Sequence, residues 1–307
     1  MKNVSESGRK KAGPKKSPLA LRLLAREHKY SIHAQRFVLD SFCTLMWSPS
    51  GTRYRNTRIA GVPGRWVLGH QEGAQRLLIL LHGGGYMTGS SRSHRSLAAN
   101  LCRHVGALGL VPDYRLAPEY PYPAALEDVL RVYRSLLAAG VPAGSIVLAG
   151  DSAGGGLALC LMHAARDAGL PLPAAAFLLS PWCDLTDVYR PLRLVRGGAR
   201  RDFAHWIVAY LRDMYAAGHD PRHPYMSPLH GEFYGFPPMH VAVGRQEVLY
   251  RDAAEVVRKA SRAGVYATLS DYRGPIHVAP FLAPVSGWAA HHLKKGARFL
   301  REHCPGE

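Results

Sequence analysis

The feature that most constrains the fold is a serine between small residues, at the junction of an apparent strand and an apparent helix. The run 145–149 is short, apolar and typical of a strand buried on both faces, and 155–165 is rich in Leu and Ala, as a helix would be. Between them stands Gly150-Asp151-Ser152-Ala153-Gly154. Such a sharp turn needs small neighbours, because the strand and the helix almost touch, and it exposes the serine hydroxyl. The pattern predicts a nucleophile elbow with Ser152 at its tip.

A second glycine-rich run lies upstream, directly after the almost wholly apolar stretch 76–81. His82-Gly83-Gly84-Gly85 can bring its backbone close to a ligand and turn N–H groups inward. Together with the elbow, this loop predicts an oxyanion hole, and each donor in such a hole is typically worth about 3 kcal/mol in the transition state. The amides expected to donate are those of Gly83, Gly84 and Ala153.

Two other interpretations of this loop are a flexible turn and a phosphate-binding loop. A dinucleotide fingerprint requires Gly-x-Gly-x-x-Gly at the opening of a helix, followed later by an acid. Gly83, Gly85 and Gly89 do not have that spacing. The sequence therefore disfavours a nucleotide site.

Strand-like and helix-like segments alternate along most of the chain. We expect an α/β fold with a mostly parallel, eight-stranded sheet and helices on both faces. Ligands in such folds bind at the carboxyl ends of the strands, where Ser152 lies. The expected strands are 52–59, 65–68, 77–81, a strand ending near 111–114, 145–149, 174–179, 239–243 and 267–272, and the main helices are near 93–105, 124–139 and 201–214.

The organisation along the chain divides into three parts. We expect a basic, disordered tail over residues 1–18, one or two N-terminal cap helices over residues 19–50, and the catalytic domain over residues 51–307. The first two strands are expected to pair around the turn Gly61-Val62-Pro63-Gly64. The alternation breaks at about 188–225, which predicts a helical insertion over the site that completes the cap.

Composition narrows the class of protein. The chain has 307 residues, enough for one large domain with an elaboration. Five scattered cysteines argue against a disulfide framework, and their spacing does not suggest a metal site. Since the sequence shows neither a secretory signal nor an apolar stretch of the roughly 20 residues that span a bilayer, we expect a cytoplasmic protein.

The formal net charge of +17 is unusual, and part of it lies in the first 18 residues. A solvated tail is the simplest interpretation, while attachment to nucleic acid or to an anionic membrane is the alternative. The remaining excess is scattered arginine without the interleaved aromatic residues that favour strand binding. We therefore expect no nucleic-acid partner.

A serine nucleophile needs a histidine base and a carboxylate that orients it, and in this fold the chain order is serine, acid, histidine. His277 stands in the loop after the last expected strand, whereas the other later histidines fall in a strand, in helices or in the polar insertion. Glu247 lies close to the end of strand 239–243. Asp252 is the rival acid, although it is expected to lie on the following helix.

From about Leu77 to its end the chain resembles the hormone-sensitive-lipase-like group of bacterial carboxylesterases in the α/β-hydrolase superfamily. Besides the glycine loop and the elbow, the resemblance rests on Asp113-Tyr114-Arg115-Leu116-Ala117-Pro118-Glu119, on Pro123–Asp128, and on Ser180-Pro181-Trp182 followed by Asp184-Leu185-Thr186. It implies Ser152 as nucleophile, His277 as base and Glu247 as acid, and it assigns Tyr114, Arg115 and Glu119 a bracing role. Arg245 and Gly274-Pro275-Ile276 depart from the residues that are common in this group.

The resemblance and the motifs predict a serine carboxylesterase for short- to medium-chain esters, with an acyl-enzyme intermediate and no metal or organic cofactor. A specialised lactone hydrolase or a deacetylase of a secondary metabolite is the alternative. A non-catalytic ligand-binding protein on the same fold is a more remote one, because such proteins typically lose a triad residue. The expected partner is a small ester substrate. Members of the group often dimerise, and the sequence neither requires nor excludes a homodimer.

Overall fold

A computed structural model describes residues 19–44, 46–69, 75–186, 198–273 and 276–305. In these residues a single sheet holds eight strands in the order β1-β2-β4-β3-β5-β6-β7-β8. The strands β1 and β2 and the strands β2 and β4 are antiparallel, and the pairs from β4 to β8 are parallel. The bounds are β1 Arg53–Ile59, β2 Val62–Leu68, β3 Leu77–Leu81, β4 Leu108–Pro112, β5 Ile146–Asp151, β6 Ala175–Leu179, β7 Met239–Gly244 and β8 Ala267–Tyr272.

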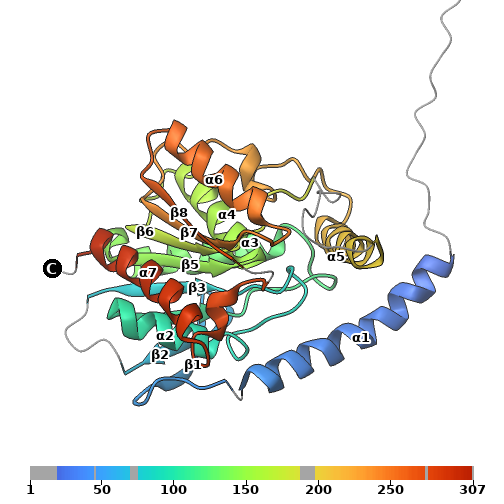
Figure 1. The fold of residues 1–307 in the computed structure, drawn as a ribbon, viewed down its shortest axis with the longest axis horizontal. Coiled ribbons are helices and arrows are strands. Elements are labelled where there is room, and N and C mark those ends of the chain that lie inside the picture. The colour runs from blue at the N-terminus through green and yellow to red at the C-terminus, as the bar shows by residue number, and fades with distance from the viewer. Residues whose placement is uncertain (1–18, 45, 70–74, 187–197, 274–275, 306–307) are drawn as a thin grey trace, which may run out of the picture.

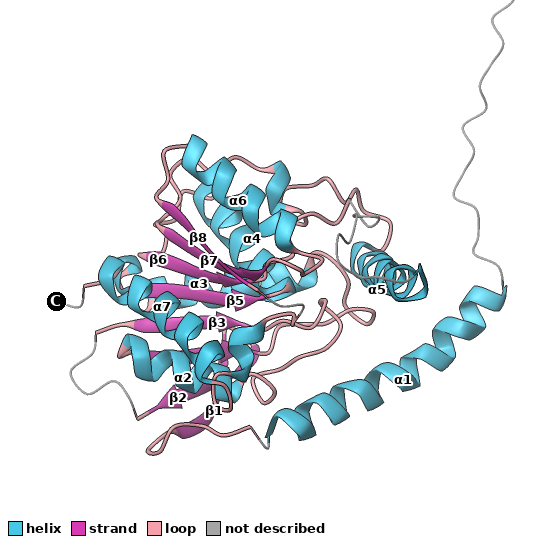
Figure 2. Ribbon diagram, in the orientation of Figure 1, coloured by secondary structure: helices cyan, strands magenta, loops and turns pink. Residues whose placement is uncertain are grey.

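Helices cover both faces of this sheet, and two more lie apart from it at one end (Figures 1 and 2). Both the mostly parallel sheet and its two-sided helical cover were predicted from the sequence and are confirmed. The bounds are α1 Leu19–Thr44, α2 Arg95–Val105, α3 Ala124–Ala138, α4 Ala153–Asp167, α5 Gly198–Ala216, α6 Tyr250–Arg262 and α7 Gly287–His303.

The central strand β3 shows how the two apolar layers form. Consecutive side chains of a strand point to opposite faces, so a strand covered on both sides is apolar throughout. Leu80 packs in the cluster that includes Leu101 of α2 and Leu300 of α7. Leu81 packs in the other cluster, with Leu157 of α4. The glycine-rich loop that follows β3 therefore starts from a strand that is packed on both faces.

The first hairpin differs from the sequence prediction. The turn was expected at Gly61-Val62-Pro63-Gly64, but β1 ends at Ile59 and β2 begins at Val62. Ala60 and Gly61 have φ values of 48° and 82°, which suits a two-residue hairpin turn. Gly64 instead lies inside β2, where an added Cβ would approach the Val111 carbonyl oxygen to 2.7 Å. That glycine serves the close pairing of β2 with β4.

The N-terminal segment forms one long helix, α1, and the helix expected at 201–214 is α5. Residues 1–18 and the start of the expected insertion lie outside the described residues. The five cysteines are all buried free thiols. In the parts of the chain that the structure describes, each helix is too short or too polar to cross a membrane.

Candidate active site

Ser152 occupies a strained turn between β5 and α4. Its φ is 53° and its ψ is −121°, a combination that non-glycine residues rarely adopt. The Ser152 N–H donates to the Leu179 carbonyl oxygen at 2.8 Å, and the Ser152 carbonyl oxygen accepts from the Trp182 N–H at 2.9 Å. These two bonds, to the last residue of β6 and to the segment after it, hold the elbow conformation that the strand–turn–helix pattern predicted.

Close backbone approach explains the glycines that follow Ser152. An added Cβ at Gly154 would lie 2.1 Å from the Leu81 carbonyl oxygen, and one at Gly156 would lie 2.0 Å from the Trp182 carbonyl oxygen. Both distances are far below van der Waals contact, and the neighbouring atoms are backbone atoms that cannot easily move. The start of α4 is thus fitted between the glycine loop and the segment after β6.

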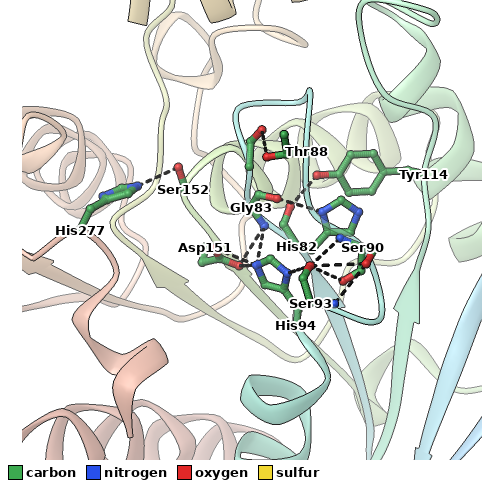
Figure 3. Close-up of polar contacts among 11 residues, drawn as sticks. His82, Gly83, Thr88, Ser90, Ser93, His94, Tyr114, Asp151, Ser152 and His277 are labelled. Atoms are coloured by element: carbon green, nitrogen blue, oxygen red, sulfur yellow. Dashed lines mark hydrogen bonds and ion pairs between the residues drawn. The ribbon is translucent and has the colours of Figure 1, made fainter. Parts of the chain in front are cut away.

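The structure brings the three predicted side chains into one line. His277 Nε2 lies 2.9 Å from Ser152 Oγ, and its Nδ1 lies 2.6 Å from Glu247 Oε2. Figure 3 shows the His277 ring directed at the Ser152 hydroxyl. Since an ionised carboxylate only accepts hydrogen bonds, Glu247 favours the tautomer with its proton on Nδ1. Nε2 is then free to accept the proton of the serine hydroxyl.

Glu247 is held by a dense set of donors. Its side chain is 1% exposed, whereas that of His277 is 44% exposed. Oε1 accepts from Ser180 Oγ at 2.9 Å, from the Gly244 N–H at 2.6 Å and from the Tyr272 hydroxyl at 3.0 Å. Oε2 is left for His277. Burial and the charge of Glu247 raise the pKa of Tyr272, which keeps that phenol in its donating form.

Sequence reasoning gave Ser180 and Tyr272 no role in the site, although Ser180 stands in one of the motifs of the family resemblance. Ser180 directly follows β6, and Tyr272 is the last residue of β8. Both strands flank β7, which leads to Glu247. The carboxyl ends of neighbouring parallel strands meet at one edge of a sheet, so polar residues at these ends could have been grouped with Glu247.

The rival acid and the rival histidines serve other contacts. Asp252 accepts hydrogen bonds from the N–H groups of Cys183 and Asp184, at 2.8 and 3.0 Å. His240 Nδ1 lies 2.7 Å from Thr268 Oγ1, and His163 Nε2 lies 3.2 Å from the Pro228 carbonyl oxygen. Burial lowers the pKa of both histidines to about 4, so each stays neutral in the core.

The glycine loop requires one correction. The Gly83 N–H was expected to bind the oxyanion, but it donates to Asp151 Oδ1 at 3.0 Å. That acceptor already satisfies the amide, and Gly83 is not among the residues that line the cavity. Gly84 and Gly85, by contrast, both line the cavity beside Ser152.

The bracing residues named from the family motif all make polar contacts. The Tyr114 hydroxyl donates to the His82 carbonyl oxygen at 2.5 Å. Arg115 pairs with Asp128 at 2.9 Å, and Glu119 pairs with Arg36 of α1 at 2.8 Å. These contacts fix the start of the glycine loop and attach α1 to the body.

Of the two departures from the family pattern, Arg245 lies among the described residues, whereas most of Gly274-Pro275-Ile276 does not. Arg245 pairs with Asp271 at 2.7 Å. Gly274 and Pro275 lie outside the described residues.

A cavity of about 710 Å³ opens in front of Ser152 and His277. Its walls are mostly apolar. Besides Ser152 and His277, the sheet side contributes Gly84, Gly85, Met87, Thr88, Asp151, Trp182, Val248, Leu249 and Val278, and the helical side contributes Ile32 and Gln35 of α1 and Ile207, Val208, Tyr210 and Leu211 of α5. Across the described ranges, the acidic, histidine and cysteine side chains form no group of three or more that could hold a metal ion.

Comparison with known proteins agrees with this geometry. A family model described as α/β hydrolase fold matches residues 78–281. The chain is 42% identical over 234 residues to an acetyl-hydrolase of Streptomyces hygroscopicus, covering 74% of this chain and 75% of that protein. It is 33% identical over 242 residues to an esterase of Acinetobacter venetianus, covering 79% and 80%.

Solved structures extend the match over nearly the whole chain. An esterase from the bacterial hormone-sensitive lipase family superposes with a TM-score of 0.82 at 32% identity, covering 95% of this chain and 94% of that one. An esterase/lipase from an uncultured bacterium gives 0.81 at 33% identity, with the same coverage. The chain therefore belongs to the α/β-hydrolase family, in the hormone-sensitive-lipase-like group of bacterial esterases that its motifs predicted.

Proposed function

We propose that this chain is a serine carboxylesterase that hydrolyses short- to medium-chain esters through an acyl-enzyme intermediate. One observation carries the proposal. An unbroken line of hydrogen bonds runs from buried Glu247 through His277 to the Ser152 hydroxyl, which faces the cavity. A serine, a histidine and a carboxylate in this order form the arrangement that activates a serine for acyl transfer.

In the first step, Ser152 Oγ attacks the ester carbonyl carbon while His277 Nε2 accepts the hydroxyl proton. Glu247 stabilises the imidazolium that forms, and His277 then gives the proton to the departing alcohol. In the second step, His277 takes a proton from water, whose oxygen attacks the acyl-enzyme and releases the acid. Ser152 regains its proton, and the cycle closes without a metal or an organic cofactor.

The oxyanion that forms in both steps needs donors that are already in place. We assign this role to the amides of Gly84, Gly85 and Ala153. Ala153 opens α4, so its N–H is one of the unpaired amides at a helix start, where the dipole also favours negative charge. Gly85 thus replaces Gly83 in the set that the sequence predicted, because Gly83 is bonded to Asp151.

Substrate selection belongs to the helical side of the cavity. We assign residues 19–50 and about 188–225 to a cap over the domain 51–307. The mostly apolar side chains that α1 and α5 place in the cavity favour uncharged acyl and alcohol groups. The volume of about 710 Å³ leaves room for a medium-length chain beyond the ester group.

Deacetylation is the second candidate. Its support is the 42% identity to an acetyl-hydrolase, which is higher than the 33% identity to the Acinetobacter venetianus esterase. The same nucleophile and oxyanion hole would release acetate from a larger alcohol or amine that fills the rest of the cavity. A lactone hydrolase would use the same steps on a cyclic ester.

The test is hydrolysis of p-nitrophenyl esters from acetate to palmitate by the wild type and by Ser152→Ala. We expect activity that is greatest at short to medium chain length, and a loss of about 10⁶-fold in kcat in the variant. Hydrolysis by Ser152→Ala at more than a thousandth of the wild-type rate would refute the proposed nucleophile. A wild type that is folded but inactive on these esters and cleaves acetylated alcohols or lactones would instead select the second candidate or the lactone hydrolase.

A further inference from the structure

A chain of polar contacts connects the residue before the nucleophile with helix α1. We call its five members the loop clamp, and they are Asp151, His94, Ser93, Ser90 and Asp40. Figure 3 shows the first four beside the glycine loop. The proposed mechanism gives the loop clamp no proton transfer and no substrate contact, although one end of it adjoins Ser152 in sequence.

At the inner end of the loop clamp, His94 and Asp151 form a buried pair at ion-pair distance. His94 is 5% exposed and Asp151 is 4% exposed. His94 Nε2 lies 3.2 Å from Asp151 Oδ1 and 3.3 Å from Oδ2. Nε2 also lies 3.2 Å from the Gly83 nitrogen. Because an ionised carboxylate can only accept hydrogen bonds, we assign a proton to Nε2 that it donates to Asp151, and the Gly83 N–H then bonds the carboxylate rather than the ring. The same Oδ1 accepts the Gly83 N–H, and a Cβ at Gly83 would lie 2.2 Å from Asp151 Oδ2.

These contacts determine where the next two amides point. Gly83 is tied to Asp151, and Gly84 and Gly85 follow at positive φ values of 117° and 62°. A rotation of the Gly83 peptide would therefore redirect the Gly84 and Gly85 N–H groups. Burial alone would raise the pKa of Asp151, but His94, His82 and the Gly83 N–H lower it below its usual value. The carboxylate thus stays charged and keeps hold of the loop.

The outer end of the loop clamp reaches the cap. His94 Nδ1 lies 2.9 Å from Ser93 Oγ, which accepts the Ser90 N–H at 2.8 Å. The Ser90 hydroxyl donates to Asp40 Oδ1 on α1 at 2.5 Å. One turn earlier on α1, Arg36 Nε donates to the Met87 carbonyl oxygen at 2.7 Å. Helix α1 therefore holds the segment that follows the glycine loop at two points.

We propose that His94 is a positioning residue of the oxyanion hole, and that the loop clamp makes the aim of the Gly84 and Gly85 amides depend on the seating of α1. The proposal rests on the esterase function proposed above. It follows because a single chain of bonds joins the Gly83 peptide to Asp40, and because small displacements of oxyanion donors are costly in rate. His94 acts through Asp151 and touches neither substrate nor Ser152.

The first test compares His94→Ala with His94→Gln, whose side-chain amide can still donate toward Asp151. We expect His94→Ala to lower kcat on p-nitrophenyl butyrate by about 100-fold, as for loss of one oxyanion donor, with KM changed less than about threefold. Affinity for a trifluoromethyl ketone, which forms an oxyanion on Ser152, should fall by a similar factor. His94→Gln should recover at least about tenfold of the lost kcat.

Three outcomes would overturn the role of His94. They are a kcat for His94→Ala within about threefold of the wild type, a fall in kcat with unchanged ketone affinity, and a His94→Gln variant as slow as His94→Ala. A thermal melt of each variant accompanies the kinetics. If His94→Ala does not fold, the comparison moves to the outer end of the loop clamp, where Asp40 is only half-buried and its substitution is expected to leave the fold intact.

The second test is Asp40→Ala, with Asp213→Ala as the matched control on α5. Asp213 is an exposed cap residue that pairs only with its neighbour Arg212 in the ion pairs of the described chain. We expect Asp40→Ala to lower kcat by about three- to tenfold with little change in KM, and the control to keep the wild-type kcat. Equal kcat values for the two variants would overturn the link to α1.

These outcomes are separable from failure of the proposed function. If wild-type protein hydrolyses esters and Ser152→Ala does not, the function holds whatever the His94 and Asp40 variants do. If Ser152→Ala keeps its activity, the function itself fails.

Discussion

The sheet side and the helical side of the cavity are built from different kinds of contact. On the sheet side, backbone meets backbone, as where a Cβ at Gly154 would lie 2.1 Å from the Leu81 carbonyl oxygen. On the helical side, α1 and α5 present flexible side chains such as Ile32 and Val208. Backbone contacts allow one arrangement, whereas side chains can repack. The difference suggests that rate is set on the sheet side and selectivity on the helical side.

The strongest test of this division removes the charge of the acid on the sheet side. Glu247→Gln keeps the shape of the side chain but no longer favours the productive tautomer of His277 or stabilises its charged form. We expect kcat to fall by about 10⁴-fold with a nearly unchanged KM, measured on p-nitrophenyl butyrate. Asp252→Asn is the control, because Asp252 caps the 183–184 backbone and should change stability more than kcat. The reverse result would assign the acid to Asp252.

The next test asks whether the sheet side tolerates one added methyl group. In Gly156→Ala the Cβ would lie 2.0 Å from the Trp182 carbonyl oxygen. We expect a loss of about 3 kcal/mol in the free energy of unfolding, seen as a fall in Tm of several degrees. Gly144→Ala, where an added Cβ meets no atom within 4 Å, should leave Tm nearly unchanged. Equal melting curves would mean that the elbow region repacks as freely as the cap.

At acid pH, we expect His163 to lower the stability of the fold without taking part in the proposed reaction. Burial lowers the pKa of His163 from 6.5 to about 4, so below pH 6.5 the unfolded chain binds a proton that the folded chain does not. The stability that this neutral imidazole contributes is complete above pH 6.5 and is lost as the pH falls toward 4, by up to about 3 kcal/mol. His163→Gln should therefore flatten the fall of Tm between pH 6.5 and 4 while keeping the wild-type kcat at pH 7. An unchanged slope would contradict this origin of the acid sensitivity.

The smallest effect is expected on the helical side. Val208→Ala enlarges the cavity at a side chain that lies outside the hydrogen-bonded line from Glu247 to Ser152. We expect kcat/KM for octanoate to rise about three- to tenfold relative to butyrate, with kcat on acetate unchanged within about twofold. Arg212→Ala, four residues further along α5 and outside the cavity lining, should keep the wild-type chain-length profile. A loss of kcat on acetate in Val208→Ala would place rate control on the helical side as well.

Much of the fold and part of the site could be predicted from the sequence. The positions of Ser152, His277 and Glu247 relative to strand ends are local properties, because apolar runs and breaks in them mark the strands. The sequence prediction placed the first hairpin turn too far along the chain, because glycine can serve two different purposes. At Gly61 it supplies a positive φ of 82°, and at Gly64 it lets β4 come close.

The contacts that the sequence could not supply are those made by side chains distant along the chain. The sequence of three consecutive glycines does not distinguish which of their amides faces the substrate. In the function proposed above, the choice is made by Asp151, 68 residues away, whose carboxylate accepts the Gly83 N–H. Ser180 and His94 were overlooked for a related reason, since each acts on a carboxylate that only the folded chain brings near.

The packing of Leu211 against Gly85 has a consequence for anyone who reshapes this enzyme. A Cβ at Gly85 would lie 2.6 Å from Leu211 Cδ1, so the cap residue rests directly on the loop that is proposed to bind the oxyanion. Four residues further along α5, Tyr215 is buried and stacks on Tyr86 with ring centroids 3.7 Å apart. A mutational library for new substrates should therefore vary the earlier positions of α5 and leave Leu211 and Tyr215 unchanged. A change at either residue would widen the range of substrates only at the cost of a lower kcat.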